Sequence, residues 1–217
     1  MVHVLGNENT ILNKFIAQIR DRQIQCDSMR FRRNMERIGE IMSYEISKTL
    51  NYSPLTVETP LGEAQVEMIS DKVVVATVLR AGLPLHQGIL NYFDDAESAF
   101  VSAYRKNKKD GTFKIDVEYV SSCDLEGKVL ILVDPTLATG QSLRMTYETL
   151  IAQCGQPQHT HVVSVVASEQ GVEYALNHLP SKSTTLWLGA VDAELTSKAY
   201  IVPGIGDAGD LCYGKKL

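Results

Sequence analysis

Hydrophobic residues in the first fifty positions recur at the spacing of an α-helix. Between residues 11 and 19 an apolar residue returns every four positions, and a second apolar series extends from Phe31 to Ile46. Ser28 precedes the second series and is a candidate helix cap. The pattern predicts a helical N-terminal segment over residues 1–50.

The pattern changes after residue 70, where short apolar runs alternate with amphipathic stretches. The runs are rich in β-branched residues, which is typical of buried strands. Strands that alternate with helices imply a sheet with helices on both faces. We therefore predict an α/β fold with a doubly wound, mostly parallel sheet. The predicted strands cover residues 72–79, 98–104, 128–133, 161–167 and 184–191; the predicted helices cover residues 83–92, a segment with Leu143, Tyr147, Leu150 and Ile151 on its apolar face, and residues 170–179.

One predicted strand differs from the others in its pattern. Residues 113–119 alternate strictly between apolar and polar side chains, and a charged turn over residues 106–111 precedes them. Alternation of this kind is typical of a strand with one exposed face. It predicts a half-exposed β-hairpin, or flap.

The composition is that of an ordinary globular protein. The 217 residues are 44% apolar, which is enough for the core of one large α/β domain. A net charge of -5 gives no general attraction to nucleic acid or anionic membranes, so an anionic ligand needs a local site. The four cysteines form no CxxC pair, the N-terminus has no signal-peptide pattern, and no apolar run approaches the roughly 18 residues of a membrane helix. These features predict a cytoplasmic protein with reduced thiols.

Four arginines flank the second helical series. They form either a patch for phosphate or a nucleotide, or the solvated face of a helix. We favour the solvated face, because charges opposite an apolar stripe are the usual arrangement in a surface helix. The four are Arg30, Arg32, Arg33 and Arg37.

Two histidines and one tryptophan also have competing interpretations. His159 and His161 lie two positions apart on a predicted strand, which could place both imidazoles on one face. Because no third ligand follows at suitable spacing, we favour a structural role over a metal site. Trp187 lies in a strand-like run and is predicted to belong to the core. No serine has the G-x-S-x-G context of a hydrolase nucleophile.

The strongest candidate for chemistry is the segment 133–142, VDPTLATGQS. A buried strand ends at Asp134, a tight loop follows, and a helix begins. Ligands bind at the carboxyl ends of strands in such sheets, and backbone N–H groups at a helix N-terminus hold phosphate. Thr139 and Ser142 add hydroxyl donors, and Gly140 lets the backbone approach a ligand closely. Asp134 would accept hydrogen bonds from ribose hydroxyls.

Two other phosphate-binding motifs are absent from the sequence. There is no G-x-x-x-x-G-K-[ST] string, and the 133–142 segment has a single glycine where a dinucleotide fingerprint has three. An ordinary strand-to-helix connection with Thr and Ser caps is the remaining alternative. We favour the phosphate site over it.

The string DPTLATGQS over residues 134–142 resembles the phosphoribosyl pyrophosphate (PRPP) signature of phosphoribosyltransferases, in the version of the uracil phosphoribosyltransferase family. Three further segments resemble that family in the same order. Residues 79–83, LRAGL, are similar to its pyrophosphate loop, and Tyr104-Arg105 is similar to its Tyr-Arg element before the flap. Residues 200–210, YIVPGIGDAGD, are similar to its uracil-binding segment.

The resemblance extends from about Phe31 to the C-terminus, with some departures. Gln141 stands where the family usually has Gly, and Thr136 stands where it usually has Met. Residues 84–86 replace a usual Gly-Met-containing turn, and residues 106–121 differ in composition from the commoner pattern. The departures concern the flap and the kinetics more than the reaction.

The resemblance implies a glycosyltransferase (a pentosyltransferase) with the type I phosphoribosyltransferase fold, which joins uracil to PRPP and gives UMP and diphosphate in pyrimidine salvage. It implies that Asp134 holds the ribose hydroxyls, that Arg80 and Arg105 neutralise the diphosphate, and that Asp207 lies between uracil and PRPP and orients water on Mg²⁺. These four are the implied catalytic residues. The implied PRPP-binding residues are Arg80, Arg105, Asp134, Pro135, Thr136, Leu137, Ala138, Thr139, Gly140, Gln141, Ser142 and Asp207; the implied uracil-binding residues are Ile201, Gly206, Asp207 and Ala208.

The cofactor and partners are implied in the same way. Mg²⁺ would be held mainly by PRPP and water, with no direct protein ligand. Uracil and PRPP are the expected substrates, GTP is a candidate effector, and a homodimer or larger homo-oligomer is expected, without nucleic acid or membrane. The expected organisation is one domain over residues 1–217, with a helical segment over 1–50, an α/β core over 72–191 and a uracil-binding tail over 192–217.

Two alternatives remain open. One is a non-catalytic regulator on the same fold that binds RNA or a nucleotide, but it needs a basic face, and the net charge argues against one. The other is a phosphoribosyltransferase for a different base. The 200–210 segment has no Lys or Arg, and its polar side chains are those of Tyr200, Asp207 and Asp210. We therefore expect backbone groups to recognise uracil, and cytosine and orotate to be rejected.

Overall fold

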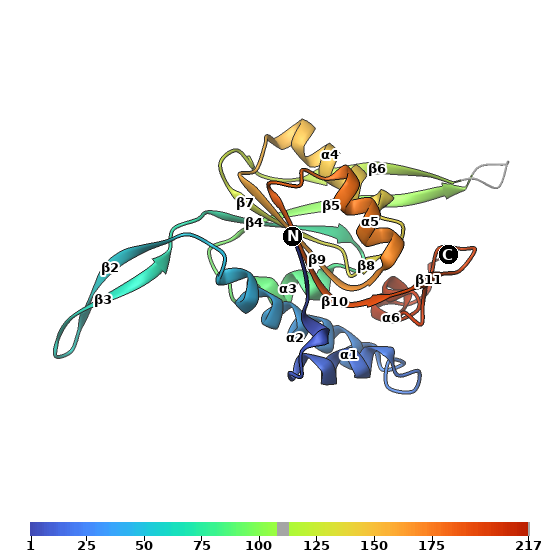
Figure 1. The fold of residues 1–217 in the computed structure, drawn as a ribbon, viewed down its shortest axis with the longest axis horizontal. Helices are drawn as coiled ribbons and strands as arrows, with labels where there is room; N and C mark the ends of the chain where they lie inside the picture. The colour runs from blue at the N-terminus through green and yellow to red at the C-terminus, as the bar shows by residue number, and fades with distance from the viewer. Residues whose placement is uncertain (108–112, 217) are drawn as a thin grey trace.

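A central sheet organises the chain in the structure, which is a computed structural model (Figure 1). The structure describes residues 1–107 and 113–216, and it describes side chains in these ranges outside residues 103–118. The sheet has eight strands. Among the described residues, its strand pairs are parallel except the antiparallel pair formed by residues 97–107 and 113–121. The strand order is β1 (Val2–Val4), β10 (Thr184–Asp192), β9 (His159–Ser168), β7 (Val129–Val133), β4 (Val73–Leu79), β5 (Glu97–Asn107) and β6 (Phe113–Ser121), with the short β8 (Thr136–Leu137) paired to β9.

Helices cover both faces of this sheet, as Figure 1 shows. One hydrophobic core lies beneath the first three helices, and a second core lies beneath the next two. The central strands are buried on both sides, and all five residues of β7 are buried. The predicted doubly wound, mostly parallel α/β fold is therefore confirmed. The first group of helices is α1 (Leu12–Arg20), α2 (Ser28–Ser47) and α3 (Leu83–Leu90), and the second is α4 (Gln141–Cys154) and α5 (Glu169–His178).

The N-terminal segment is less uniformly helical than its apolar spacing predicted. Residues 2–4 form β1, which pairs in parallel with β10, and the 3₁₀-helix η1 (Leu5–Asn7) follows. The cap of α2 is Asp27 and not Ser28, because the Asp27 carboxylate accepts a hydrogen bond from the Arg30 N–H. Ser28 is the first helical residue. Three residues are too few for a recognisable alternation, so the edge strand left no pattern in the sequence.

A long hairpin that the sequence did not predict projects from the body of the molecule (Figure 1). Its strands are β2 (Tyr52–Thr59) and β3 (Gly62–Ile69), and they form a separate antiparallel sheet. We call residues 52–69 the arm. Nearly all its residues are exposed, including large apolar ones. Residues 63–68 alternate strictly between polar and apolar side chains, so the strand pattern was present in the sequence and the prediction overlooked it.

The predicted flap is confirmed as a hairpin, because β5 and β6 pair in antiparallel fashion. The predicted charged turn covered residues 106–111; residues 106–107 belong to β5, and residues 108–111 lie outside the described residues. The C-terminal tail, residues 192–217, contains the short strands β11 (Glu194–Leu195) and β12 (Ile201–Val202) and the helix α6 (Ala208–Tyr213). No helix in the described part of the chain is long and apolar enough to span a membrane.

Candidate functional site

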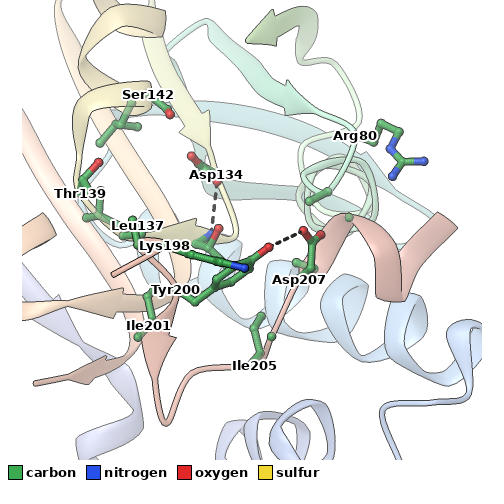
Figure 2. A pocket seen from close by; sticks show the side chains of 18 of the residues that line it. Arg80, Asp134, Leu137, Thr139, Ser142, Lys198, Tyr200, Ile201, Ile205 and Asp207 are labelled. Atoms are coloured by element: carbon green, nitrogen blue, oxygen red, sulfur yellow. Dashed lines mark hydrogen bonds between the residues drawn. The ribbon is translucent and has the colours of Figure 1, made fainter. Parts of the chain in front are cut away.

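A pocket of about 520 Å³ lies at the carboxyl ends of the central strands (Figure 2). Three segments far apart in the sequence meet there: the end of β4, the loop between β7 and α4, and the C-terminal tail. Figure 2 shows Thr139 and Ser142 at one end, Arg80 at the other, and Asp134 and Asp207 between them. The pocket is lined by residues 79–81, 134, 136–140, 142–143, 198–201, 205–209 and 216.

The 134–142 loop is held on two sides. Pro135 offers its carbonyl to two N–H groups of β9, and residues 136–137 pair with that strand as β8. The Ser168 hydroxyl donates to the Ala138 carbonyl and accepts from the Gly171 N–H, so the cap of α5 also fixes the loop. A backbone tied in this way is preorganised for a ligand, since it need not be ordered on binding.

Gly140 closes the loop and begins α4 with a left-handed backbone, at a φ of 76°. A Cβ atom at this position would lie 2.7 Å from Cδ1 of Tyr174 in α5. Both the conformation and the close approach therefore require glycine. The N-terminus of α4, where unpaired N–H groups favour anions, opens beside this residue.

The structure brings most of the predicted loop residues to the pocket, but not all of them. Asp134, Thr139 and Ser142 line it together with residues 136–138 and Gly140. Pro135 is buried against β9, and the side chain of Gln141 is exposed outside the lining. An exposed side chain here explains how the chain accommodates Gln where the family usually has Gly.

Asp134 and Asp207 supply the carboxylates of the pocket. Oδ1 of Asp134 accepts from the Thr136 N–H at 3.3 Å, in the first turn of the loop. Oδ1 of Asp207 accepts from the Asp210 N–H at 2.9 Å and so caps α6, while Oδ2 accepts from the Tyr200 hydroxyl at 3.4 Å. Figure 2 shows Tyr200 and Asp207 facing each other across the pocket.

Arg80 is in contact with the C-terminal tail. Its Nη2 donates to the Gly214 carbonyl at 3.1 Å and lies 3.5 Å from Oδ1 of Asp210. Its Nε is buried and has no hydrogen-bond partner among the described residues. A buried N–H without a partner is costly, and an anion in the pocket would satisfy it. The side chain of Arg105 lies outside the described residues, although its backbone belongs to β5.

The residues that the resemblance implies for recognition of the base lie around the same pocket. Ile201, Gly206 and Ala208 line the pocket, and so does Ile205, which the prediction omitted. Ile201 and Ala208 are largely buried, and Gly206 has a φ of 78°.

Two lysines line the same pocket, and the sequence analysis missed both. Lys198 lies just before the 200–210 segment, and Lys216 lies after it. A tight turn, in which the Ala199 N–H bonds to Thr196 and the Thr196 N–H bonds to Tyr200, folds Lys198 back to the site. The pocket therefore holds cations just outside residues 200–210, and the expected rejection of orotate stays a prediction. Nothing in the spacing of the segment indicated this turn.

Two of the four arginines of α2 have more than a solvated role, since the Arg37 guanidinium lies over the Phe15 ring of α1. Arg32 donates to the Cys212 carbonyl at 2.6 Å, and its guanidinium lies over the Tyr213 ring. It therefore connects α2 to α6. Arg33 pairs with Glu36, as expected for a solvated helix face.

The histidine pair lies in a packed aromatic cluster. His161 is 3% exposed, and its Nδ1 accepts from Nε1 of Trp187 at 3.0 Å. Trp187 is also 3% exposed and stacks on His3, so its predicted place in the core is confirmed. In the described part of the chain, no three His, Cys, Asp or Glu side chains are arranged to hold a metal ion. The geometry favours the structural interpretation of His161.

Acid should destabilise this cluster. Burial, with a smaller effect of His159, lowers the pKa of His161 to about 3, whereas an unfolded histidine titrates near 6.5. The unfolded chain therefore binds a proton first, and stability falls as pH drops below about 6.5, by up to about 1.4 kcal/mol per pH unit. In His161→Gln the amide carbonyl can still accept from Trp187 but does not titrate. Urea unfolding between pH 7 and 5 should show a steeper loss for the wild type than for His161→Gln; parallel curves would contradict the assignment.

Comparisons with known proteins agree with this geometry. The family model described as uracil phosphoribosyltransferase matches residues 7–215, a longer stretch than the motifs indicated. A uracil phosphoribosyltransferase from Porphyromonas gingivalis is 53% identical over 213 residues, which are 98% of each chain. One from Methanothermobacter thermautotrophicus is 35% identical over 96% of this chain and 94% of its own length. The solved structure of the AQ2163 protein from Aquifex aeolicus covers both chains fully with a TM-score of 0.88 at 24% identity, which supports the fold. The chain therefore belongs to the uracil phosphoribosyltransferase family.

Proposed function

We propose that this protein transfers the phosphoribosyl group of PRPP to uracil, giving UMP and diphosphate in pyrimidine salvage. One observation carries the proposal: the 134–142 loop, Arg80 and the 200–210 segment line a single pocket. These are the segments that resemble the family's motifs for PRPP, diphosphate and uracil. The family match and the 53% identical relative support the same reaction.

Each part of the substrates has a counterpart in the pocket. The N–H groups of the 134–142 loop, with the hydroxyls of Thr139 and Ser142, would hold the 5′-phosphate. Asp134 would accept from the ribose hydroxyls, and Arg80 and Arg105 would neutralise the diphosphate. As the bond between C1 of ribose and the diphosphate oxygen breaks, its electron pair leaves with the diphosphate; N1 of uracil forms the new bond to C1 and releases its proton to water or to the departing diphosphate. Negative charge grows on the leaving diphosphate, so the preorganised guanidinium groups of Arg80 and Arg105 would lower the barrier.

Mg²⁺ is the proposed cofactor, and the residues of the pocket fit it. Asp134 and Asp207 both line the pocket and can accept hydrogen bonds from metal-bound waters. Mg²⁺ keeps several waters and takes few protein ligands, so a pocket with two carboxylates and a diphosphate suits it. When bound, the ion would neutralise part of the charge on the diphosphate.

Turnover with different bases tests the proposal. The 200–210 segment offers uracil mainly backbone groups, whose donor or acceptor identity is fixed. Cytosine would face two of these groups with the wrong partner, at about 1–3 kcal/mol each. We expect UMP formation from uracil and PRPP, with kcat/KM for cytosine lower by about 100-fold or more, because each 1.4 kcal/mol is a factor of ten.

Steady-state product analysis with uracil, cytosine and orotate measures this directly. A folded protein that turns over another base with PRPP but not uracil would disprove the proposed function. Equal kcat/KM for cytosine and uracil would disprove recognition of the base by backbone groups. Faster turnover of orotate would identify a phosphoribosyltransferase for a different base, with Lys198 as the partner of the carboxylate.

We also propose that residues 1–217 act as one domain and assemble into a homodimer or larger homo-oligomer. Residues of α1, α2, the sheet and α6 share one hydrophobic core, which supports a single unit. The arm supports assembly, because an isolated two-stranded hairpin is marginal in water and a second copy would cover its apolar side chains. The exposed residues in question are Tyr52, Leu55, Leu61, Val66, Met68 and Ile69.

The unpaired state of all four cysteines supports a reducing compartment such as the cytoplasm.

A further inference from the structure

A bidentate ion pair joins the N-terminal helix α1 to the carboxyl end of β10. Arg20 is the last residue of α1, and Asp192 is the last residue of β10. The two Nη atoms of Arg20 lie 2.8 Å from the two carboxylate oxygens of Asp192. The Asp192 side chain is only 8% exposed, and that of Arg20 is 23% exposed. A bidentate pair in a largely buried position is geometrically specific as well as strong.

Both members of the pair also hold Gly204. Nη1 of Arg20 donates to the Gly204 carbonyl at 3.0 Å, and Oδ2 of Asp192 accepts from the Gly204 N–H at 2.9 Å. Both backbone polar groups of this residue are therefore fixed by side chains from outside its own segment.

Gly204 occupies a sensitive position in the base-binding segment. It lies between Ile201 and Ile205, which line the pocket, whereas neither Arg20 nor Asp192 does. The strand pairing of β12 ends at Val202, so the ladder does not hold the backbone beyond that point. Gly204 also has a φ of 56°, and a Cβ atom there would overlap the Ile201 carbonyl. The backbone that follows is an irregular turn whose conformation depends on contacts of this kind.

We infer that Arg20 and Asp192 are positioning residues that set the affinity for the base by fixing residues 201–206. This inference rests on the proposed function, because it takes that segment as the uracil site. Recognition by backbone groups requires the backbone to be in place before the base binds, and a displacement of about 1 Å in such a site can cost about 100-fold. The 134–142 loop that would hold the 5′-phosphate lies on another segment, so the effect should fall mainly on the base.

Steady-state kinetics of Arg20→Met and Asp192→Asn test the inference. We expect KM for uracil to rise about tenfold or more in both variants, with KM for PRPP within about twofold of the wild type, because only the base segment loses its support. Arg20→Lys should be intermediate, since a lysine cannot bridge both oxygens and the carbonyl with a rigid fork. Arg33→Met is the matched control, because it breaks the Arg33–Glu36 pair of α2 and leaves Gly204 untouched.

Hydrogen exchange gives a second measurement that does not depend on activity. In the ligand-free protein, the amides of residues 201–202 and 204–206 should exchange at least about tenfold faster in Arg20→Met than in the wild type or Arg33→Met, because local opening becomes easier. The strands β7 and β9 should keep their protection in all of them. A folded Arg20→Met protein with unchanged uracil KM, or an equal rise in both KM values, would overturn the inference.

The two measurements separate this inference from the proposed function. If the wild type fails to use uracil while Arg20→Met loosens residues 201–206, the proposed function fails and the support of the segment stands. If the wild type uses uracil and the variant neither loosens the segment nor raises the uracil KM, the inference fails and the proposed function stands.

Discussion

Replacing Asp134 with Asn should lower kcat/KM for PRPP by about 100-fold, which is the scale of losing one preorganised electrostatic contact in an active site. The carboxylate lies in the pocket at the end of β7 and accepts from the Thr136 N–H. A charged acceptor binds ribose hydroxyls more strongly than a neutral amide does. The Asn side chain has the same size and keeps one carbonyl oxygen for Thr136, so the fold should persist.

Thermal unfolding and steady-state kinetics together decide this prediction. Asp134→Asn should melt at the wild-type temperature and lose most of its turnover. Asp94→Asn is the matched control, because Asp94 is exposed on a loop away from the pocket and carries the same change of charge. Near-normal kcat/KM in a well-folded Asp134→Asn protein would remove Asp134 from the site.

The features that could be predicted are those that the residues of a single segment determine. The central strands are buried on both faces, so they read as unbroken apolar runs such as VLILV in β7. The 134–142 loop needs a specific order of an acidic residue, small residues and a glycine, so it leaves a recognisable string. Residues 113–119 alternate between apolar and polar side chains, a pattern typical of a strand with one exposed face, and they form a strand of the hairpin.

The features that the sequence did not reveal depend on contacts between distant segments. Arg20 and Asp192 are 172 positions apart, and neither lies in a motif. Lys198 reaches the pocket only through the turn between residues 196 and 200. Ser168 had a weak signal as a helix cap, but its bond to Ala138 depends on how α5 packs on the loop. A single sequence has no local pattern that records such tertiary contacts.

The arm was missed for a different reason. Its strands pair only with each other, and their side chains face solvent on both sides in the single chain. Residues 63–68 do alternate between polar and apolar side chains, but the prediction did not take that pattern into account. The exposed apolar residues of the arm support the proposed assembly.

Two glycine substitutions should separate backbone strain from disruption of the phosphate site. Gly140 and Gly127 both have a left-handed backbone, with φ of 76° and 68°. An alanine at either position costs about 1–2 kcal/mol for that conformation. At Gly127 the added Cβ atom meets nothing within 4 Å, whereas at Gly140 it lies 2.7 Å from Tyr174.

Gly140→Ala should therefore lower kcat/KM for PRPP by about 100-fold, because the loop must shift away from α5 and a displacement of about 1 Å has effects of that size. Gly127→Ala should lose comparable stability and keep kcat/KM within about twofold of the wild type, since it lies outside the pocket and only the strain is shared. Urea unfolding gives the stability of both variants, and initial rates at varied PRPP give the catalytic effect. If Gly140→Ala retained the efficiency of Gly127→Ala, residues 134–142 would not hold the 5′-phosphate, because a loop displaced against Tyr174 could not keep its N–H groups directed at the same oxygens.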